Sequence, residues 1–324
     1  MKKTALQLLA QRDLARKEKD FKKADSIRRE IEVMGYQIVD GVKGVELLRI
    51  KELKNQGIKE LKKGLVAVFG SGEMSPTGRR IHEYLISDKK PPVKIALLET
   101  PAGFEENPRS WYGKLAEMLE VGLAPYQPQI FFVEALTRKG TKSTNDKEIL
   151  RTLLSAHYIH TGAGSPTYAV KHLKNSLAFK YLYQQNQKGL SLSFASAAAI
   201  AIGRFCLPVY EIYKAGANLH WEDGLDFFKR FDLNLTIIPH WNNQEGGAEI
   251  DTSCCYMGQK RFNELRKILP GATTILGIDE QTAAVFDPNK KEVLIMGNGE
   301  VVVIKGQKAD HFSSGENFSF TLLN

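Results

Sequence analysis

Residues 189–200 read Gly-Leu-Ser-Leu-Ser-Phe-Ala-Ser-Ala-Ala-Ala-Ile, and they give the clearest indication of the fold. The apolar run Leu190–Phe194 is followed at once by small residues that open a helical segment, which is typical of a strand turning sharply into a helix. A serine at such a turn has a strained backbone and needs small neighbours. Ala195 and Ala197 supply them, so Ser196 is a candidate nucleophile, with a simple helix N-cap as the alternative.

Similar apolar runs alternate with helical segments along the rest of the chain from Gly64 onward. The runs are Leu65–Phe69, Val93–Leu98, Ile130–Val133, Tyr158–His160, Leu190–Phe194, Leu233–Ile238 and Thr274–Ile278. Fully apolar strands that alternate with helices predict a parallel sheet covered on both faces. We therefore expect an α/β fold of three layers, a mostly parallel sheet between two layers of helices, with antiparallel strands added at one edge near the C-terminus.

The N-terminal part of the chain has a different charge. Residues 1–64 hold 17 Lys and Arg against 10 Asp and Glu, whereas residues 65–324 hold 28 against 27. Apolar residues spaced by three and four over residues 4–35 predict a small helical hairpin. A basic unit of this kind suits RNA or another anionic partner, or is a solvated helix face. The expected divisions are a basic unit at 1–55, a linker at 56–63, the α/β domain at 64–305 and a polar tail at 306–324.

Several classes of protein are excluded by the composition. The longest strongly apolar stretch, residues 193–203, is about half of the ~20 residues that a membrane span needs. The first residues lack the apolar core of a signal peptide, and three cysteines form no C-x-x-C pair, so we expect a cytoplasmic protein without a membrane anchor. The adjacent Cys254 and Cys255 do not have a usual ligand spacing, and Gly70–Glu73 lacks a third glycine, so we expect no metal and no cofactor.

In parallel α/β sheets ligands lie beyond the carboxyl ends of the strands, so the residues after each apolar run are the candidates for a site. His240 ends one such run and is the candidate base for Ser196. Glu211 lies in an apolar stretch where an unpartnered carboxylate is costly, so it is the first choice to orient His240. Other carboxylates that folding could bring near remain open, namely Asp223, Asp251 and Asp279.

An attack on a carbonyl also needs an oxyanion hole of two backbone N–H groups. Ala197, at the start of a helix, is expected to provide one, and Gly164 in the loop after Tyr158–His160 the other. The remaining candidates are substrate contacts at the same strand ends. They are Gly72, Glu73, Ser165, Trp241 and Asn242.

At these residues the chain resembles the serine peptidases of the dipeptidase E and cyanophycinase group, whose fold is similar to that of class I glutamine amidotransferases. The resemblance lies in Gly162–Ser165, Phe194–Ala199, Pro239–Trp241 and Gly277–Ala283, and it covers about residues 64–305. It implies a serine hydrolase that cleaves small peptides or amides through an acyl-enzyme. Ser196 is then the nucleophile, His240 the base, and the acid lies near Glu211.

Residues 5–49 resemble the C-terminal appendage of cysteinyl-tRNA synthetases, through the spelling of Ala15–Arg29. This resemblance implies tRNA or another RNA as a partner, and the alternative to the hydrolase is an RNA-binding protein with an inactive amidotransferase-like scaffold. An amidotransferase subunit is disfavoured because that chemistry uses a cysteine where this chain has Ser196. The candidate nucleic-acid contacts are Lys22, Lys23, Arg28 and Arg29.

Overall fold

The computed structural model describes residues 2–18, 20–41, 44–49, 62–271 and 273–324. Within the chain, two compact units are distinguished, residues 1–62 and residues 63–324. The linker expected at 56–63 lies outside the described residues except for its last two positions. No helix among the described residues is both long enough and apolar enough to cross a membrane.

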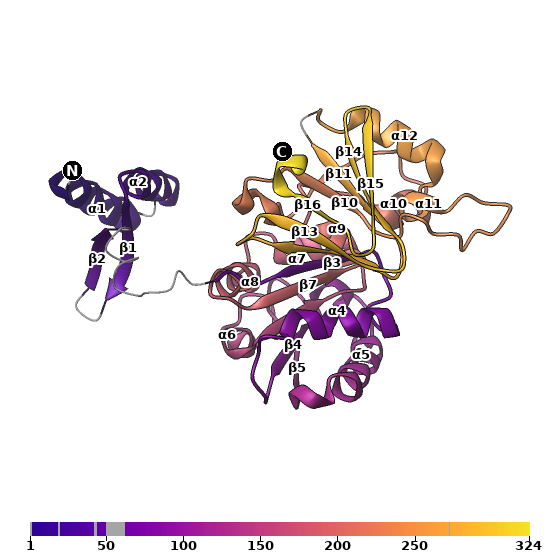
Figure 1. Cartoon of the computed structure of the whole chain (residues 1–324), viewed down its shortest axis with the longest axis horizontal. Helices are drawn as coiled ribbons and strands as arrows, with labels where there is room; N and C mark the ends of the chain where they lie inside the picture. The colour runs from indigo at the N-terminus through magenta and orange to yellow at the C-terminus, as the bar shows by residue number, and fades with distance from the viewer. Residues whose placement is uncertain (1, 19, 42–43, 50–61, 272) are drawn as a thin grey trace. The chain divides into compact units, whose positions relative to one another are not determined.

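The N-terminal unit is a helical hairpin followed by a β-hairpin (Figure 1). Its elements are α1 (Lys2–Lys17), α2 (Phe21–Val33), β1 (Tyr36–Gly41) and β2 (Gly44–Arg49). The Asp20 carboxylate accepts a hydrogen bond from the Lys23 N–H at 3.1 Å and so caps α2. Lys23 and Arg28 are exposed, and Arg28 pairs with Glu32 at 3.0 Å, whereas the side chains of Lys22 and Arg29 are outside what the structure describes.

The larger unit is built on an eight-stranded sheet whose core is parallel, as the alternating pattern predicted. The parallel strands, in spatial order, are β3 (Val66–Phe69), β7 (Ser191–Ala195), β6 (Tyr158–Thr161), β4 (Lys94–Leu98) and β5 (Gln129–Val133). Three antiparallel strands extend it beyond β3, namely β12 (Thr282–Asp287), β13 (Glu292–Gly297) and β16 (Asn317–Ser319).

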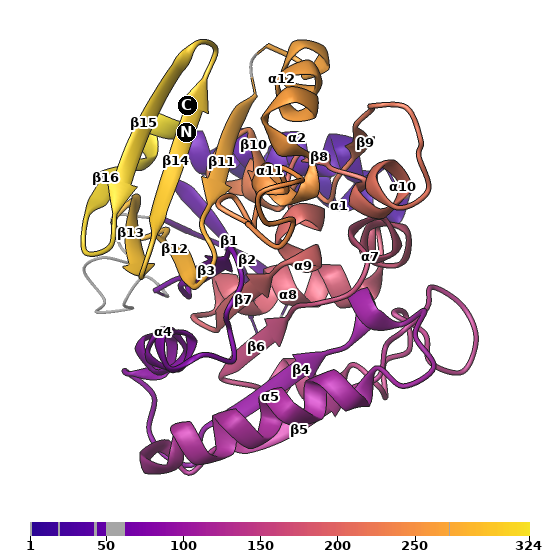
Figure 2. The same cartoon turned by 90° about the vertical axis from the view of Figure 1, so that its right-hand side faces the viewer.

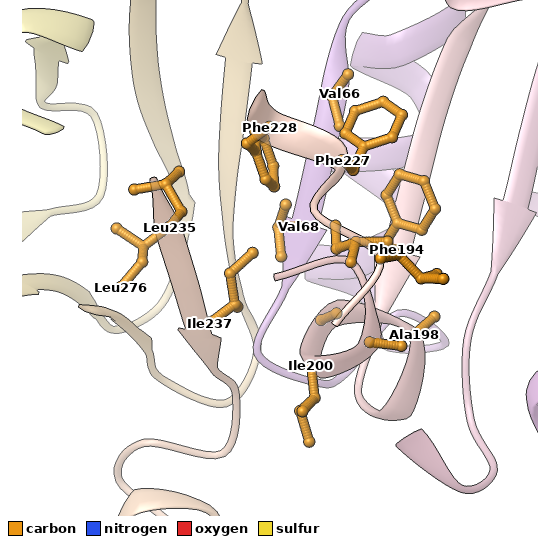
Figure 3. Packing of buried hydrophobic residues seen from close by; sticks show 14 of the residues in the cluster. Val66, Val68, Phe194, Ala198, Ile200, Phe227, Phe228, Leu235, Ile237 and Leu276 are labelled. Atoms are coloured by element: carbon orange, nitrogen blue, oxygen red, sulfur yellow. The ribbon is translucent and has the colours of Figure 1, made fainter. Parts of the chain in front are cut away.

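Helices cover both faces of this sheet (Figure 2). One face carries α4 (Pro76–Ile86) and α5 (Arg109–Gly122), and the other carries α6 (Arg151–Ser155), α7 (Pro166–Leu173), α8 (Leu177–Gln187) and α9 (Ala197–Ala201). Alternate strand residues point to opposite faces, so Val66 and Val68 join one buried cluster while Ala67 and Phe69 join the other. Figure 3 shows the first cluster, where Val66 and Val68 lie near Phe227, Phe228 and Phe194.

Two of the strands expected in the main sheet belong to a second, four-stranded sheet. Its order is β10 (Leu235–Ile238), β11 (Thr274–Ile278), β14 (Glu300–Lys305) and β15 (Lys308–Ser313). The edge of β3 is already taken by β12, so β10 and β11 pair with each other and β11 pairs with β14 instead. Leu235, Ile237 and Leu276 of this sheet pack into the first cluster (Figure 3).

The residues after 305 are not the polar tail that the sequence suggested. They form β15, β16 and a short 3-10 helix, Phe320–Leu323, that buries Phe320 and Leu323. Further short elements lie in the segments between these strands and helices. They are η1 (Thr100–Ala102), η2 (Ala124–Tyr126), β8 (Phe205–Cys206), α10 (Val209–Tyr213), β9 (Glu222–Asp223), η3 (Phe227–Phe231), α11 (Ser253–Tyr256) and α12 (Gly258–Ile268).

Candidate active site

Ser196 occupies a strained turn between β7 and α9. Its backbone angles are φ 48° and ψ −114°, a conformation that costs a non-glycine residue about 1–3 kcal/mol. The flanking Ala195 and Ala197 are buried, so the turn has no room for larger side chains. The hydroxyl does not cap α9. It lies 3.0 Å from Nε2 of His240, which is the arrangement expected of a nucleophile and its base.

His240 follows β10 and is fixed by its backbone. Its N–H donates to the Gly70 carbonyl at 3.0 Å, and its own carbonyl accepts from the Cys255 N–H at 3.1 Å. Its φ is also positive, at 50°. The loop after β3 and helix α11 therefore fix the backbone of His240, and 16% of its side chain is exposed.

The other imidazole nitrogen, Nδ1, lies 2.8 Å from Oε1 of Glu280. The buried Asn243 amide donates to the same oxygen at 3.0 Å, and the Asn242 side-chain oxygen accepts from the Glu280 N–H at 2.8 Å. The hydrogen bond with His240, aided by that from Asn243, lowers the pKa of Glu280 against the opposing effect of burial. The Glu280 carboxylate therefore contacts Nδ1 of His240, and this contact favours its ionised form.

The expectation that Glu211 orients His240 is wrong. Glu211 lies in α10, and its Oε1 accepts from the Thr167 hydroxyl at 2.6 Å. The carboxylates left open as alternatives also have other partners. Asp223 pairs with Lys174 at 3.6 Å, Asp251 accepts from Ser253 and Gln259, and Asp279 accepts from the Glu300 N–H.

A signal for Glu280 was present in the sequence. It comes two residues after the apolar run Thr274–Ile278, at a strand end, and within the motif Gly277–Ala283. Like His240, Glu280 therefore follows the carboxyl end of an apolar strand, where ligands are expected.

The loop that follows β6 is held close to the start of α9. The Ala198 N–H donates to the Gly162 carbonyl at 3.2 Å, and the Ser165 N–H donates to the Pro101 carbonyl at 2.9 Å. Gly164 has a φ of 138°, and a Cβ there would lie 2.1 Å from the Pro101 oxygen, so only glycine fits. Ala197 is the first residue of α9, where an N–H has no partner within the helix.

Glu73, an expected substrate contact, lies instead in a buried polar layer beside this loop. It is only 5% exposed, and burial raises its pKa although its own N–H and the charge of His240 act in the opposite sense. A Cβ on Gly162 would lie 2.8 Å from Nε2 of His160 and 3.5 Å from Oε1 of Glu73, so both groups lie close to Gly162. His160 is fully buried, and its Nδ1 lies 2.7 Å from the Ser193 hydroxyl.

The other expected substrate contacts have diverse positions. Trp241 packs edge-on against Phe262 and over Gly277, and the Asn242 side chain accepts from the Glu280 N–H. Both side chains therefore contact protein groups around the site. Gly72 has a φ of 74° and lies against Gln281. Ser165 lines a cavity next to the loop.

The fold is shared with a solved structure of another protein. A scan against models of known protein families finds no match, and no curated protein matches the chain. The crystal structure of a peptidase from an acI-B1 Actinobacterium superposes with a TM-score of 0.64 at 22% identity, over 81% of this chain and 99% of that one. A putative Peptidase E protein from Listeria monocytogenes EGD-e matches with a TM-score of 0.46 at 14% identity, over 78% of this chain and 98% of that one. The first of these confirms the predicted fold.

Proposed function

We propose that this chain is a serine hydrolase that cleaves small peptides or amides through a triad of Ser196, His240 and Glu280. The observation that carries the proposal is the continuous set of contacts from the Ser196 hydroxyl through both imidazole nitrogens to the Glu280 carboxylate, at 3.0 Å and 2.8 Å. A hydroxyl is a poor nucleophile unless a base that is itself oriented by a third group removes its proton. The strained backbone of Ser196 adds support, because such strain collects at functional sites.

In the first half of the reaction, the Ser196 oxygen attacks the carbonyl carbon of the substrate while Nε2 of His240 takes the hydroxyl proton. The resulting imidazolium is stabilised by Glu280, and the N–H groups of Ala197 and Gly164 hold the negative oxygen of the tetrahedral intermediate. The intermediate then collapses, the C–N bond breaks, and His240 gives its proton to the leaving amine. The acyl group remains on Ser196.

In the second half, water enters and His240 removes one of its protons as the hydroxyl attacks the acyl carbonyl. A second tetrahedral intermediate collapses, the ester bond to Ser196 breaks, and His240 returns the proton to the serine oxygen. The products are a carboxylic acid and an amine, and the enzyme is restored with no other reactant than water.

Two further observations support a peptidase. The structure that superposes at a TM-score of 0.64 is itself described as a peptidase. The loop around Gly164 is tied to the first turn of α9, so two backbone N–H donors start from adjacent elements next to the nucleophile.

The proposal is tested by hydrolysis of p-nitrophenyl acetate and of a dipeptide library by the full chain and by Ser196→Ala. We expect a burst of p-nitrophenol that matches the enzyme concentration, an acetyl group on Ser196, and a loss of about 10⁴–10⁶ in rate in the variant. Turnover that survives in Ser196→Ala would refute the triad. Ser155→Ala, at an exposed serine at the end of α6, is the matched control and should behave as wild type.

A further inference from the structure

A cavity of about 860 Å³ opens beside the loop Gly162–Ser165, which carries the proposed oxyanion donor Gly164. Its lining includes Ser165, the residue after Gly164, and Tyr210 of α10. Helix α10 packs on α11, where the Cys255 N–H holds the carbonyl of His240. Both parts of the lining therefore continue into the elements that position the triad, so the cavity is placed to hold a part of the substrate that flanks the scissile bond.

Carboxylates dominate the charge of this cavity. Glu105, Glu211 and Glu222 line it, and Lys171 is the single basic residue of its lining. Glu211 uses only one of its oxygens within the described part of the chain, since Oε1 accepts from Thr167 while Oε2 is buried without a hydrogen-bond partner. A buried carboxylate oxygen without a donor is costly, so a donor supplied by a ligand would be stabilised there.

Aromatic rings complete the lining. Phe104 and Tyr168 pack together with ring centroids 5.5 Å apart, and Tyr210 lies in the same lining. Phe104 is 53% and Tyr210 45% exposed, so their rings are accessible to a ligand in the cavity. Aromatic faces beside carboxylates suit a guanidinium, which stacks on rings and donates paired hydrogen bonds to carboxylates.

We propose that this cavity is the specificity pocket of the enzyme and that it accepts a basic side chain, that of arginine above all, from the peptide substrate. The inference rests on the proposed function, because it assigns the pocket to the reaction at Ser196. An acidic side chain is disfavoured there by the three carboxylates. Glu211 is a specificity-determining residue in this assignment rather than a member of the triad.

The pocket is tested by calorimetric titration of the full chain with L-arginine amide, and with L-citrulline amide, which has the same shape but no charge. We expect arginine amide to bind at least about tenfold more tightly than citrulline amide, because charge-assisted hydrogen bonds are the strong ones. In Glu211→Gln that ratio should fall toward one. Glu148→Gln, an exposed glutamate paired with Arg151 at 3.7 Å, is the matched control and should keep the ratio.

A lack of binding by arginine amide, equal binding of the two amides, or tighter binding of L-aspartic acid amide would overturn the inference. Labelling of Ser196 by a fluorophosphonate, measured in the same samples, separates this failure from failure of the proposed function. Labelled protein without the arginine preference contradicts the pocket alone, whereas unlabelled protein contradicts the triad. If Ser196 reacts and arginine amide binds, dipeptides that contain arginine should be cleaved faster than their citrulline counterparts, and equal rates would contradict the pocket.

Discussion

Replacement of Glu280 by Gln tests the role that we propose for this carboxylate. Oε1 of Glu280 accepts from both His240 and Asn243, so the amide oxygen of Gln would keep its place between these two donors. The imidazole would then keep its orientation and its Nε2 would still face Ser196. What is lost is the negative charge beside the imidazolium that forms during the attack.

The size of the effect follows from the geometry. Two unit charges about 4 Å apart attract by about 4 kcal/mol near a protein surface. Glu280 is 33% exposed, so we expect about 2–4 kcal/mol, the lower value applying where solvent screens the pair most. Since about 1.4 kcal/mol corresponds to a factor of ten, Glu280→Gln should slow the reaction of Ser196 by about 30- to 1,000-fold.

The assay is the second-order rate constant for labelling of Ser196 by a fluorophosphonate, which requires no knowledge of the substrate. Asp223→Asn is the matched control, because Asp223 is exposed and pairs with Lys174, so its rate should equal that of wild type. Circular dichroism would show that both variants are folded. A Glu280→Gln variant that reacts within a factor of about three of wild type would refute the role of Glu280.

Three further predictions concern the loop, the buried acid and the N-terminal unit. Gly164→Ala should slow the labelling of Ser196 more than tenfold, because the added Cβ would clash with Pro101. Gly140→Ala is the control: Gly140 also has a positive φ but lies in open space, so this variant should lose only about 1–3 kcal/mol of stability. Equal labelling rates of the two variants would contradict this. The pKa of Glu73 is raised in the folded protein, so stability falls as pH rises from the unfolded pKa of this carboxyl through its folded pKa. Glu73→Gln should therefore raise the thermal midpoint relative to wild type at about pH 8 but not at about pH 4. A difference in midpoint that does not depend on pH would contradict this. Replacement of four basic residues by Ala should weaken RNA binding and flatten its dependence on salt, as measured by fluorescence anisotropy, and unchanged binding would contradict the mapping. These residues are Lys22, Lys23, Arg28 and Arg29.

The parts of the fold that could be predicted are those with a local cause. Strand Ser191–Ala195 and the turn at Ser196 follow from an apolar run that meets small residues, and His240 follows from its place after Leu235–Ile238. Each of these depends on a few consecutive residues, so the sequence alone indicates them.

The parts that were missed depend on pairing between distant segments. The second sheet exists because β12 occupies the edge of β3, and nothing in the sequence of β10 or β11 shows that. Glu280 reaches His240 because β11 and β12 enter different sheets on either side of it. Glu211 was chosen for its apolar surroundings, but its partner is the hydroxyl of Thr167, 44 residues away in the sequence, which spacing could not reveal.

The most direct test of the central claim is mass-spectrometric mapping of the fluorophosphonate adduct on the full chain, with Ser196→Ala and His240→Ala beside it. A triad of Ser196, His240 and Glu280 predicts one adduct, on Ser196, that is absent from the first variant and strongly reduced in the second. An adduct on another residue, or an adduct at Ser196 that forms as fast without His240, would contradict the triad.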